Sequence, residues 1–375
     1  MPAIHVAAIV LGSVLPAQDG EIEVQAGRES DLLESVRKLS EGGPTIHFGD
    51  EGRIKFGLRE QFKLESSELE NRNDFMIRRS RFKAEGGLLP GTSFKVELKI
   101  DDVGREGHDP KAQAEDVSFF IPVLDDRAAV RIGLYDAPLS RDSLTSDSKL
   151  LLMDRSALHD AYSGVGLSDN TIGAQISGLV GERLELRVGL FDNVELDAQT
   201  RQLMPMGRVV LHLLDAEKGE YEASRPGSDA RVLSVGGSAG FLGGIETGGQ
   251  ELDLTGTEVD LFAALPGGFT FQAEYGEVAR DVVGAPDSSA SGWYAQGGYH
   301  LPGRIGAGTG ELAYRYQDHD PGDLEPAAGR ERAHTFGFNY YLLGHSLKVQ
   351  ADYTRTSREA GDDGGVFQIQ LQLDF

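Results

Sequence analysis

The sequence contains no cysteine among its 375 residues. This absence excludes disulfide scaffolds, zinc sites with cysteine ligands and thiol catalysis. Beyond the first residues, no apolar run approaches the ~20 residues that a membrane-spanning helix requires. Basic residues are also few, because 36 Lys and Arg stand against 60 Asp and Glu. The resulting formal charge of −24 argues against non-specific nucleic-acid binding, so no nucleic-acid partner is expected.

Motifs for enzyme chemistry are missing or weak. The nine histidines form no HExxH pair, and there is no phosphate-cradling Gly-Lys-Ser/Thr loop. Residues Gly236–Gly240 match the nucleophile-elbow pattern formally, but no helical pattern follows them, as that motif requires. Asp318, Asp320 and Asp323 suggest either a calcium-binding loop of unusual spacing or a solvated acidic loop. We therefore expect no enzyme activity and no cofactor or metal.

The N-terminal segment has the pattern of an exported protein. Residues Ile4–Leu15 are apolar and end at Pro16-Ala17, which resembles a secretory signal peptide over residues 1–17, although no Lys or Arg precedes the apolar run. The alternative is a buried strand or helix of a cytoplasmic domain. Residues 18–52 are expected to form a periplasmic segment with one short helix over 31–41, where leucine and valine recur at helical spacing before Gly-Gly-Pro.

From Arg53 onward the hydrophobic period changes to two. The final segment is the strictest example, since Phe367, Ile369, Leu371, Leu373 and Phe375 alternate with Gln368, Gln370, Gln372 and Asp374. Successive side chains of a strand point to opposite faces, so such segments form strands with one apolar and one polar surface. About seventeen candidate strands follow one another, separated by polar stretches such as 221–229 and 318–331 that suit extracellular loops or turns.

Two all-β architectures fit this pattern. A soluble sandwich packs its apolar face into a core, whereas a membrane barrel turns that face to lipid and its polar face to a water-filled lumen. The barrel is favoured because the alternation continues over most of the chain, because Tyr and Trp293 lie near strand ends, and because the last strand ends on Phe375. The prediction is a transmembrane antiparallel β-barrel of about sixteen strands over residues 53–375, since bacterial barrels use even numbers. The terminal pattern also resembles the signal that the outer-membrane barrel-assembly machinery reads, with Phe375 as its final aromatic residue.

Two segments resemble a known family. Residues 75–88 (FMIRRSRFKAEGGL) place Arg78, Arg79 and Arg81 before Gly86, and residues 130–162 combine a strand, a proline turn, a serine-rich stretch and Met-Asp-Arg. Both are similar to the phosphate-selective porin O and P family, most closely over residues 50–195. Leu139 departs from the family pattern, where an aromatic residue is usual, and so do residues 134–136.

The resemblance implies a sixteen-stranded porin in the cell outer membrane, often a homotrimer, with one loop folded into the lumen. The inserted loop is expected near residues 138–158; an ordinary extracellular loop is the alternative. Its candidate constriction residues are Ser140, Arg141, Ser143, Ser146, Lys149 and Arg155.

The two-residue alternation of side chains along a strand places many basic residues on the polar faces of the early strands. They are Lys55, Arg59, Lys63, Lys95, Lys99, Arg127, Arg131, Arg183 and Arg187, and only Glu97, Asp101 and Glu185 oppose them. A basic lumen selects anions by replacing their water with Lys and Arg donors. The sequence thus predicts a porin for small anions, with phosphate and polyphosphate as candidates. The alternatives are a general porin with charges paired across the lumen and a secreted or surface glycan-binding β-protein. The expected partners are small anionic solutes, outer-membrane lipid and the assembly machinery.

Overall fold

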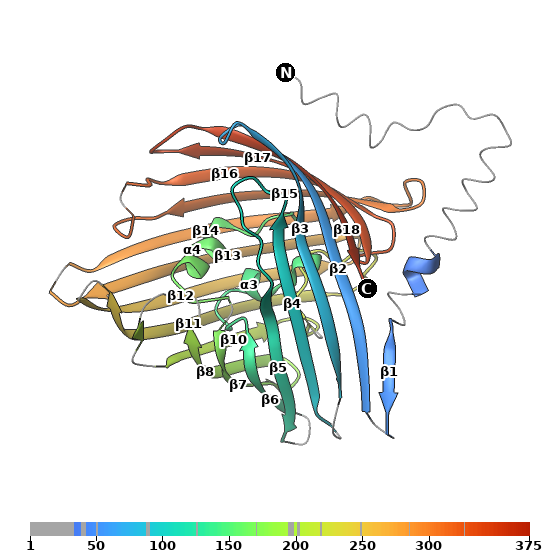
Figure 1. The fold of residues 1–375 in the computed structure, drawn as a ribbon, viewed down its shortest axis with the longest axis horizontal. Coiled ribbons are helices and arrows are strands. Elements are labelled where there is room, and N and C mark those ends of the chain that lie inside the picture. The colour runs from blue at the N-terminus through green and yellow to red at the C-terminus, as the bar shows by residue number, and fades with distance from the viewer. Residues whose placement is uncertain are drawn as a thin grey trace.

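The computed structural model describes most of the chain and shows one large antiparallel sheet (Figure 1). The described residues are 34–38, 43–49, 52–87, 91–124, 127–169, 171–193, 199–200, 203–217, 220–247, 250–284, 286–325 and 327–375. The expected signal peptide and most of the expected periplasmic segment lie outside these residues. Within the expected helix, residues 34–38 are helical. No helix in the described part of the chain is long and apolar enough to cross a membrane.

Sixteen strands of the described chain close into a ring. They are β2 (Gly52–Ser67), β3 (Arg72–Gly87), β4 (Ser93–Val103), β5 (Gln113–Val123), β6 (Ala128–Tyr135), β7 (Thr171–Val180), β8 (Leu184–Asn193), β10 (Met204–His212), β11 (Val232–Thr247), β12 (Gln250–Leu265), β13 (Phe269–Val282), β14 (Ser288–His300), β15 (Thr309–Asp320), β16 (Glu331–Tyr341), β17 (Leu347–Arg358) and β18 (Gly364–Asp374). Each pairs with its neighbours, and β18 closes the ring on β2. Two short strands, β1 (Thr45–Phe48) and β9 (Gln199–Thr200), pair with β2 and β11 beside the ring.

The distribution of side chains is inverted relative to a soluble protein. Inward positions of the strands carry buried polar residues, among them Gln61, Glu258 and Asn339. Outward positions carry exposed apolar residues, such as Phe75 at 71% and Phe336 at 58% exposure. Burying polar groups while exposing large apolar side chains suits only a molecule whose surroundings are apolar and whose interior is wet. The structure therefore decides for the barrel and against the sandwich.

The ends of the chain meet at the barrel's closing seam. Phe375 continues the ladder of β18, because its amide donates to Leu58 O at 3.0 Å and its carbonyl accepts from the Leu58 amide at 2.8 Å. Beside it, Asp374 forms ion pairs with Arg59 and Lys83 of β2 and β3 at 3.0 and 2.8 Å. The end of the barrel where β18 stops is called the C-terminal rim below, and the other end is the opposite rim.

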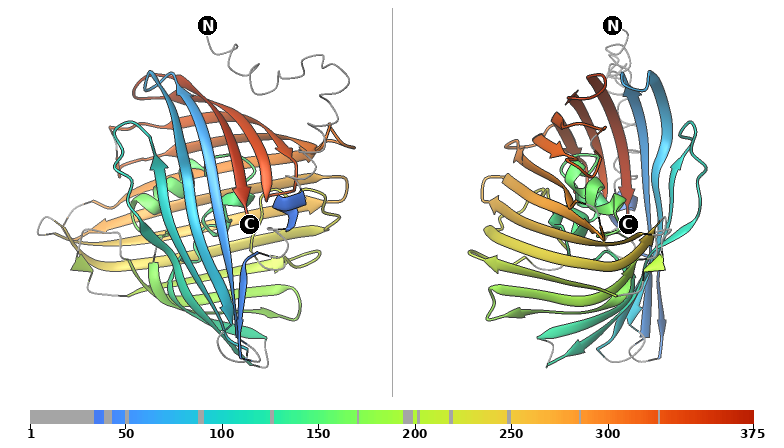
Figure 2. Two further views of the ribbon diagram at one scale, coloured as in Figure 1. Left: turned by 45° about the vertical axis from the view of Figure 1, so that its right-hand side comes forward. Right: turned by 90° about the vertical axis from the view of Figure 1, so that its left-hand side faces the viewer.

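Two connections turn into the lumen instead of crossing the rim. The inserted loop, residues 136–170, leaves β6 at the opposite rim and contains α3 (Arg141–Leu144), the 3₁₀ turn η1 (Asp147–Lys149) and α4 (Ala157–Gly164). Both α-helices lie within the wall of strands in each view (Figure 2). The second insert, residues 213–231, connects β10 to β11 at the C-terminal rim. The expectation of an external loop at 221–229 is wrong, since Tyr221 and Ser224 of this insert are buried at 2% and 0% exposure.

Candidate functional site: the lumen and its constriction

Glycines on the inner wall form the seat of the inserted loop. A Cβ at Gly276 would collide with Tyr162 Oη, and elsewhere the loop's leucines occupy the space that a side chain would need. A Cβ built on Gly256 would lie 2.9 Å from Leu167, one on Gly298 would lie 2.7 Å from Leu151, and one on Gly337 would lie 2.5 Å from Leu152. Because glycine has no side chain, the loop can pack directly against strands β12 to β16.

Polar contacts fix the loop on the same wall. They are Ser140 Oγ to Glu274 Oε2 at 2.8 Å, Tyr162 Oη to Thr257 O at 2.6 Å, Asn339 Nδ2 to Leu151 O at 2.9 Å, and Met153 N to Asp352 Oδ2 at 3.1 Å. The loop therefore covers the part of the inner wall that β12 to β17 form. The other half of the lumen, lined by β2 to β8, stays open.

The loop's serines serve its own local structure. Ser140 caps α3 by accepting from the Ser143 amide, and Ser143 Oγ lies 2.9 Å from His159 Nδ1 of α4. Side-chain oxygens at these positions satisfy amides that a helix N-terminus leaves unpaired. Arg141 is fully buried and forms an ion pair with Glu217 of the second insert at 2.7 Å. Ser140 and Arg141, two of the six candidate constriction residues, thus shape the loop and line neither cavity of the open lumen described below.

The open half of the lumen consists of two cavities of about 800 and 420 Å³. Glu115, Asp136, Asp147 and Arg155 line both of them and mark the neck between them. The larger cavity opens toward the C-terminal rim, where it is lined by Phe375, and the smaller toward the opposite rim. Four of the six candidate constriction residues of the inserted loop line the larger cavity: Ser143, Ser146, Lys149 and Arg155.

The paired arginines of β3 reach the lumen through a β-bulge. In a regular strand Arg78 and Arg79 would point to opposite faces, and one guanidinium would meet lipid. The pairing of β2 with β3 shifts by one residue here, since Gln61 opposes Arg79 whereas Phe62 opposes Ile77. The extra residue lets Arg78, Arg79 and Arg81 all line the smaller cavity. Gly86, the other motif residue, permits β2 and β3 to approach closely, because a Cβ there would collide with Arg53 O.

The adjacent strands carry matching irregularities. Glu115 is the extra residue in the pairing of β4 with β5, and Asp102 of β4 has a positive φ of 55°. As a result Glu115 and Asp116 both line the lumen, and Asp102 reaches Arg78 at 3.0 Å. Three neighbouring strands therefore each present consecutive charged residues at the level of the neck.

Carboxylates neutralise the arginines at the neck. Asp147 of η1 lies 3.1 Å from Arg79, 3.4 Å from Arg81 and 2.9 Å from Arg155. Burial works to raise the pKa of Asp147, but the surrounding guanidiniums outweigh it and hold that pKa well below its usual range. Asp147 is consequently ionised at neutral pH.

The predicted pore-lining residues fall into two groups. Seven lie on the inner face or line a cavity, and six of these have a carboxylate partner: Arg59 with Asp374 at 3.0 Å, Lys63 with Glu65 at 2.8 Å, Lys95 with Asp116 at 3.2 Å, Lys99 with Glu115 at 2.5 Å, Arg131 with Asp116 at 2.6 Å and Arg187 with Glu185 at 2.6 Å. Lys55 lines the larger cavity. Arg127 and Arg183 lie in exposed turns at the C-terminal rim, because β6 and β8 begin one residue after them.

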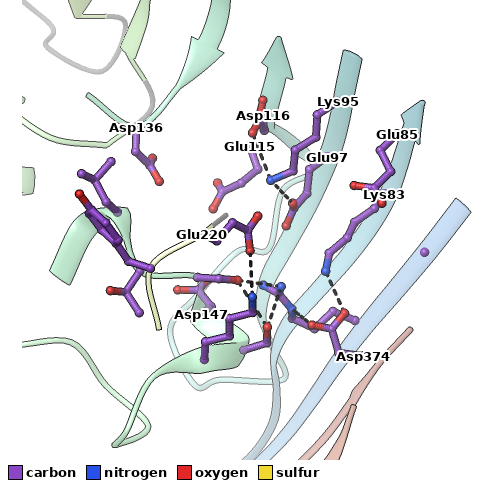
Figure 3. A pocket seen from close by; sticks show the side chains of 18 of the residues that line it. Lys83, Glu85, Lys95, Glu97, Glu115, Asp116, Asp136, Asp147, Glu220 and Asp374 are labelled. Carbon is purple, nitrogen blue, oxygen red and sulfur yellow. Dashed lines mark hydrogen bonds and ion pairs between the residues drawn. The ribbon is translucent and has the colours of Figure 1, made fainter. Parts of the chain in front are cut away.

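Charge in the larger cavity is balanced. Its basic residues are Lys55, Arg59, Lys83, Lys95, Arg131, Lys149, Arg155 and Arg187, and its acidic residues are Glu85, Glu97, Glu115, Asp116, Asp136, Asp147, Glu220 and Asp374. Figure 3 shows the carboxylates of Glu97, Glu115 and Glu220 around one open space with Lys95 among them. The sequence count missed most of these acids because they come from loops, bulges and strand ends.

Sequence reasoning also missed residues outside the early strands. Arg208 of β10 is buried between Glu258 and Asp260, at 3.0 and 2.5 Å. Its strand alternates as the others do, so the period-two pattern could have assigned it to the lumen. The second insert, with Glu217 and Tyr221, gave no such signal, because an irregular polar segment reads as an external loop. The nucleophile-elbow match at 236–240 lies wholly within β11, and the Asp318 carboxylate pairs with Arg330 at 2.6 Å.

Comparison with known proteins agrees with this architecture. The family description "Phosphate-selective porin O and P" matches residues 52–204 and 245–375, most of the chain. The chain belongs to the phosphate-selective porin O and P family. It is thus an outer-membrane porin, and the lumen described above is its channel.

This porin is similar to other proteins along almost its full length. An uncharacterized protein of Aquifex aeolicus (strain VF5) is 25% identical over 402 residues, which cover 97% of this chain and 92% of that protein. Among solved structures, the anion-selective porin from Comamonas acidovorans has a TM-score of 0.60 at 11% identity, covering 87% of this chain and 100% of that one. The channel DcaP of Acinetobacter baumannii has a TM-score of 0.59 at 10% identity, covering 88% and 99%. The trimer form of OmpT from Vibrio cholerae has a TM-score of 0.58 at 10% identity, covering 87% and 100%. At these identities the structures support the shared fold.

Proposed function

We propose that this porin is a passive, weakly selective diffusion channel for small hydrophilic solutes. The observation that carries the proposal is the pairing of cations with carboxylates along the open half of the lumen. An unpaired ladder of guanidiniums would favour anions strongly. Here each of the three clustered arginines of β3 has a carboxylate within 4 Å: Arg78 pairs with Asp102 and both Arg79 and Arg81 pair with Asp147. A passing phosphate would have to displace these carboxylates to bind.

Anion preference, with phosphate among the solutes, is the second candidate. It is supported by a continuous row of cations on β2 to β4, which runs from Lys95 in the larger cavity past the neck to Lys99 and Arg78 in the smaller one. Anions would follow this row while exchanging water for Lys and Arg donors. The description of the family and the fold similarity to an anion-selective porin also favour it.

Reversal potentials in a potassium chloride gradient across a planar bilayer separate the two candidates. Weak selectivity predicts a chloride-to-potassium permeability ratio within about threefold of unity, which corresponds to a shift of about 0.3 kcal/mol or less in the energy of each ion, opposite in sign for the two ions. A ratio far above this range, together with block of the chloride current by phosphate, would favour the second candidate. A protein that inserts without conducting would refute both.

A homotrimer is proposed as the assembly. The outer wall carries an apolar groove of about 590 Å³, in which the small residues Ala174, Gly207 and Ala239 lie among larger apolar ones such as Val188 and Leu190. Small residues on a lipid-facing surface let another apolar surface approach closely. Native mass spectrometry in detergent would test this, and a monomer that persists at all protein concentrations would contradict it.

A further inference from the structure

The second insert is unusual for its position in the barrel. Periplasmic turns of bacterial barrels are short, whereas external loops are long. The other connections between ring strands at the C-terminal rim run from three to eight residues, but residues 213–231 number nineteen. The insert also lies in the stretch 205–244, between the two segments that the family description matches. It is therefore an element that the family pattern does not account for.

Contacts with the inserted loop hold this insert inside the lumen. Glu217 accepts from both terminal nitrogens of Arg141 at 2.7 Å, and both side chains are fully buried. The amides of Ala223 and Ser224 donate to Lys149 O at 3.2 and 3.3 Å. Bidentate guanidinium–carboxylate pairs have a fixed geometry, so the two segments are joined in one arrangement.

The barrel wall holds the insert from the other side. Ser224 Oγ donates to Glu311 Oε2 at 2.9 Å, and Tyr221 Oη donates to Glu185 Oε1 at 2.9 Å. The Arg141 guanidinium also stacks over the Tyr221 ring at 4.4 Å. The described residues of the insert are thus anchored to β8 and β15 as well as to the inserted loop.

The Glu220 side chain of the insert extends into the larger cavity. It is 56% exposed, and its closest cation is Lys149 Nζ at 3.6 Å. It reaches into the space between Asp136 and the strands that carry Glu97 and Glu115 (Figure 3). Partial burial works to raise the pKa of Glu220, but Lys95 and Lys149 outweigh it and hold that pKa below its usual range. Glu220 is consequently a fixed negative charge on the path of the solute.

We propose that the second insert is a selectivity element of the channel, in which Glu220 opposes the cations of β4 and the inserted loop and disfavours multivalent anions such as sulfate or hydrogen phosphate. This inference rests on the proposed diffusion function and adds the solute class that the channel discriminates against. The energy of an ion in a fixed potential scales with its charge. The factor by which this potential changes the permeability of a monovalent anion is therefore squared for a divalent anion.

The test compares Glu220→Gln with the wild type by reversal potentials in gradients of potassium chloride and potassium sulfate. Removing one charge at roughly 8 Å from the ion path, with salt screening, should raise the permeability of chloride relative to potassium about twofold and that of sulfate relative to potassium about threefold. Glu220→Asp keeps the charge and should behave as the wild type. Glu182→Gln is the matched control, because it removes the same charge from an exposed turn at the same rim, outside the lumen.

Each outcome decides the inference. A larger gain for sulfate than for chloride in Glu220→Gln, absent from Glu182→Gln, supports it. Unchanged ratios in Glu220→Gln, or equal changes in both variants, would overturn it while leaving a conducting wild type as a diffusion channel. A wild type that inserts without conducting would refute the proposed function as well. Folding of every variant is checked by its heat-dependent mobility in SDS gels.

Discussion

Asp147 offers the sharpest test of how charge is arranged at the neck. Its carboxylate lies between 2.9 and 3.4 Å from the guanidiniums of Arg79, Arg81 and Arg155. Replacing it by asparagine keeps the size of the side chain and removes one negative charge, so the arginines lose much of their compensation. We expect Asp147→Asn to turn a weakly selective channel into an anion-selective one.

The magnitude follows from Coulomb's law. One charge about 6 Å from a passing ion contributes about 0.7 kcal/mol in a water-like medium, and screening at 0.1 M salt reduces this to about 0.4 kcal/mol. The same change favours the anion and disfavours the cation, so the two effects multiply in the permeability ratio. The chloride-to-potassium ratio should therefore rise between about threefold and about tenfold relative to the wild type, with 1.4 kcal/mol counting as about tenfold.

Reversal potentials in a bilayer give this ratio directly. Asp109→Asn is the matched control, since Asp109 lies exposed in the connection between β4 and β5 outside both cavities. Breaking a buried ion pair is destabilising, by about 3–5 kcal/mol where one partner is left uncompensated, so heat-dependent mobility in SDS gels must show that the variant is folded. A folded Asp147→Asn channel with an unchanged or lower ratio would refute the role assigned to this carboxylate.

Three further predictions concern the loop seat, the neck and the seam. Gly276→Ala should displace Tyr162 and raise the single-channel conductance. Gly297→Ala on the outer face should not, because its Cβ would have an ordinary contact of 3.4 Å. Equal conductances in the two variants would contradict the proposal that inner-wall glycines make room for the inserted loop. Burial together with neighbouring carboxylates raises the pKa of Asp136 well above its usual range. As the pH falls, Asp136 should therefore lose its charge, and the chloride-to-potassium permeability ratio from reversal potentials should rise. The Asp136→Asn variant should show no such rise. Deleting Phe375 should lower the yield of barrel in outer-membrane fractions without changing the conductance of molecules that assemble; a normal yield would argue against an assembly signal.

The sequence was sufficient for the fold because the decisive signal is local. Period-two alternation assigns each strand residue to a face without reference to any distant residue. Counting gave about seventeen candidate strands, the even strand number of bacterial barrels reduced this to about sixteen, and the structure confirms sixteen in the ring. The same counting placed Arg59, Lys63 and Arg187 on the inner face. It failed at Arg127 and Arg183, because β6 and β8 begin one residue after them and leave these arginines in turns.

Irregular backbone limited the prediction of the site. A bulge changes the face of every residue on one side of it, and the bulges at Arg78 and Glu115 depend on pairing with a neighbouring strand. Strict alternation would have sent one of each consecutive charged pair toward lipid. The family resemblance identified the arginines but carried no information on their acidic partners.

The sequence by itself determined that the apolar faces of the strands point one way and the polar faces the other. Tertiary structure alone decided which charges meet inside. The carboxylates of Asp147 and Glu220 come from segments that approach the lumen from opposite rims, far in sequence from the arginines and lysines they oppose. Electrostatic energy depends on distance in space, and no pattern along the chain encodes the distance between an inserted segment and a barrel wall. The expected basic lumen is for that reason a paired one.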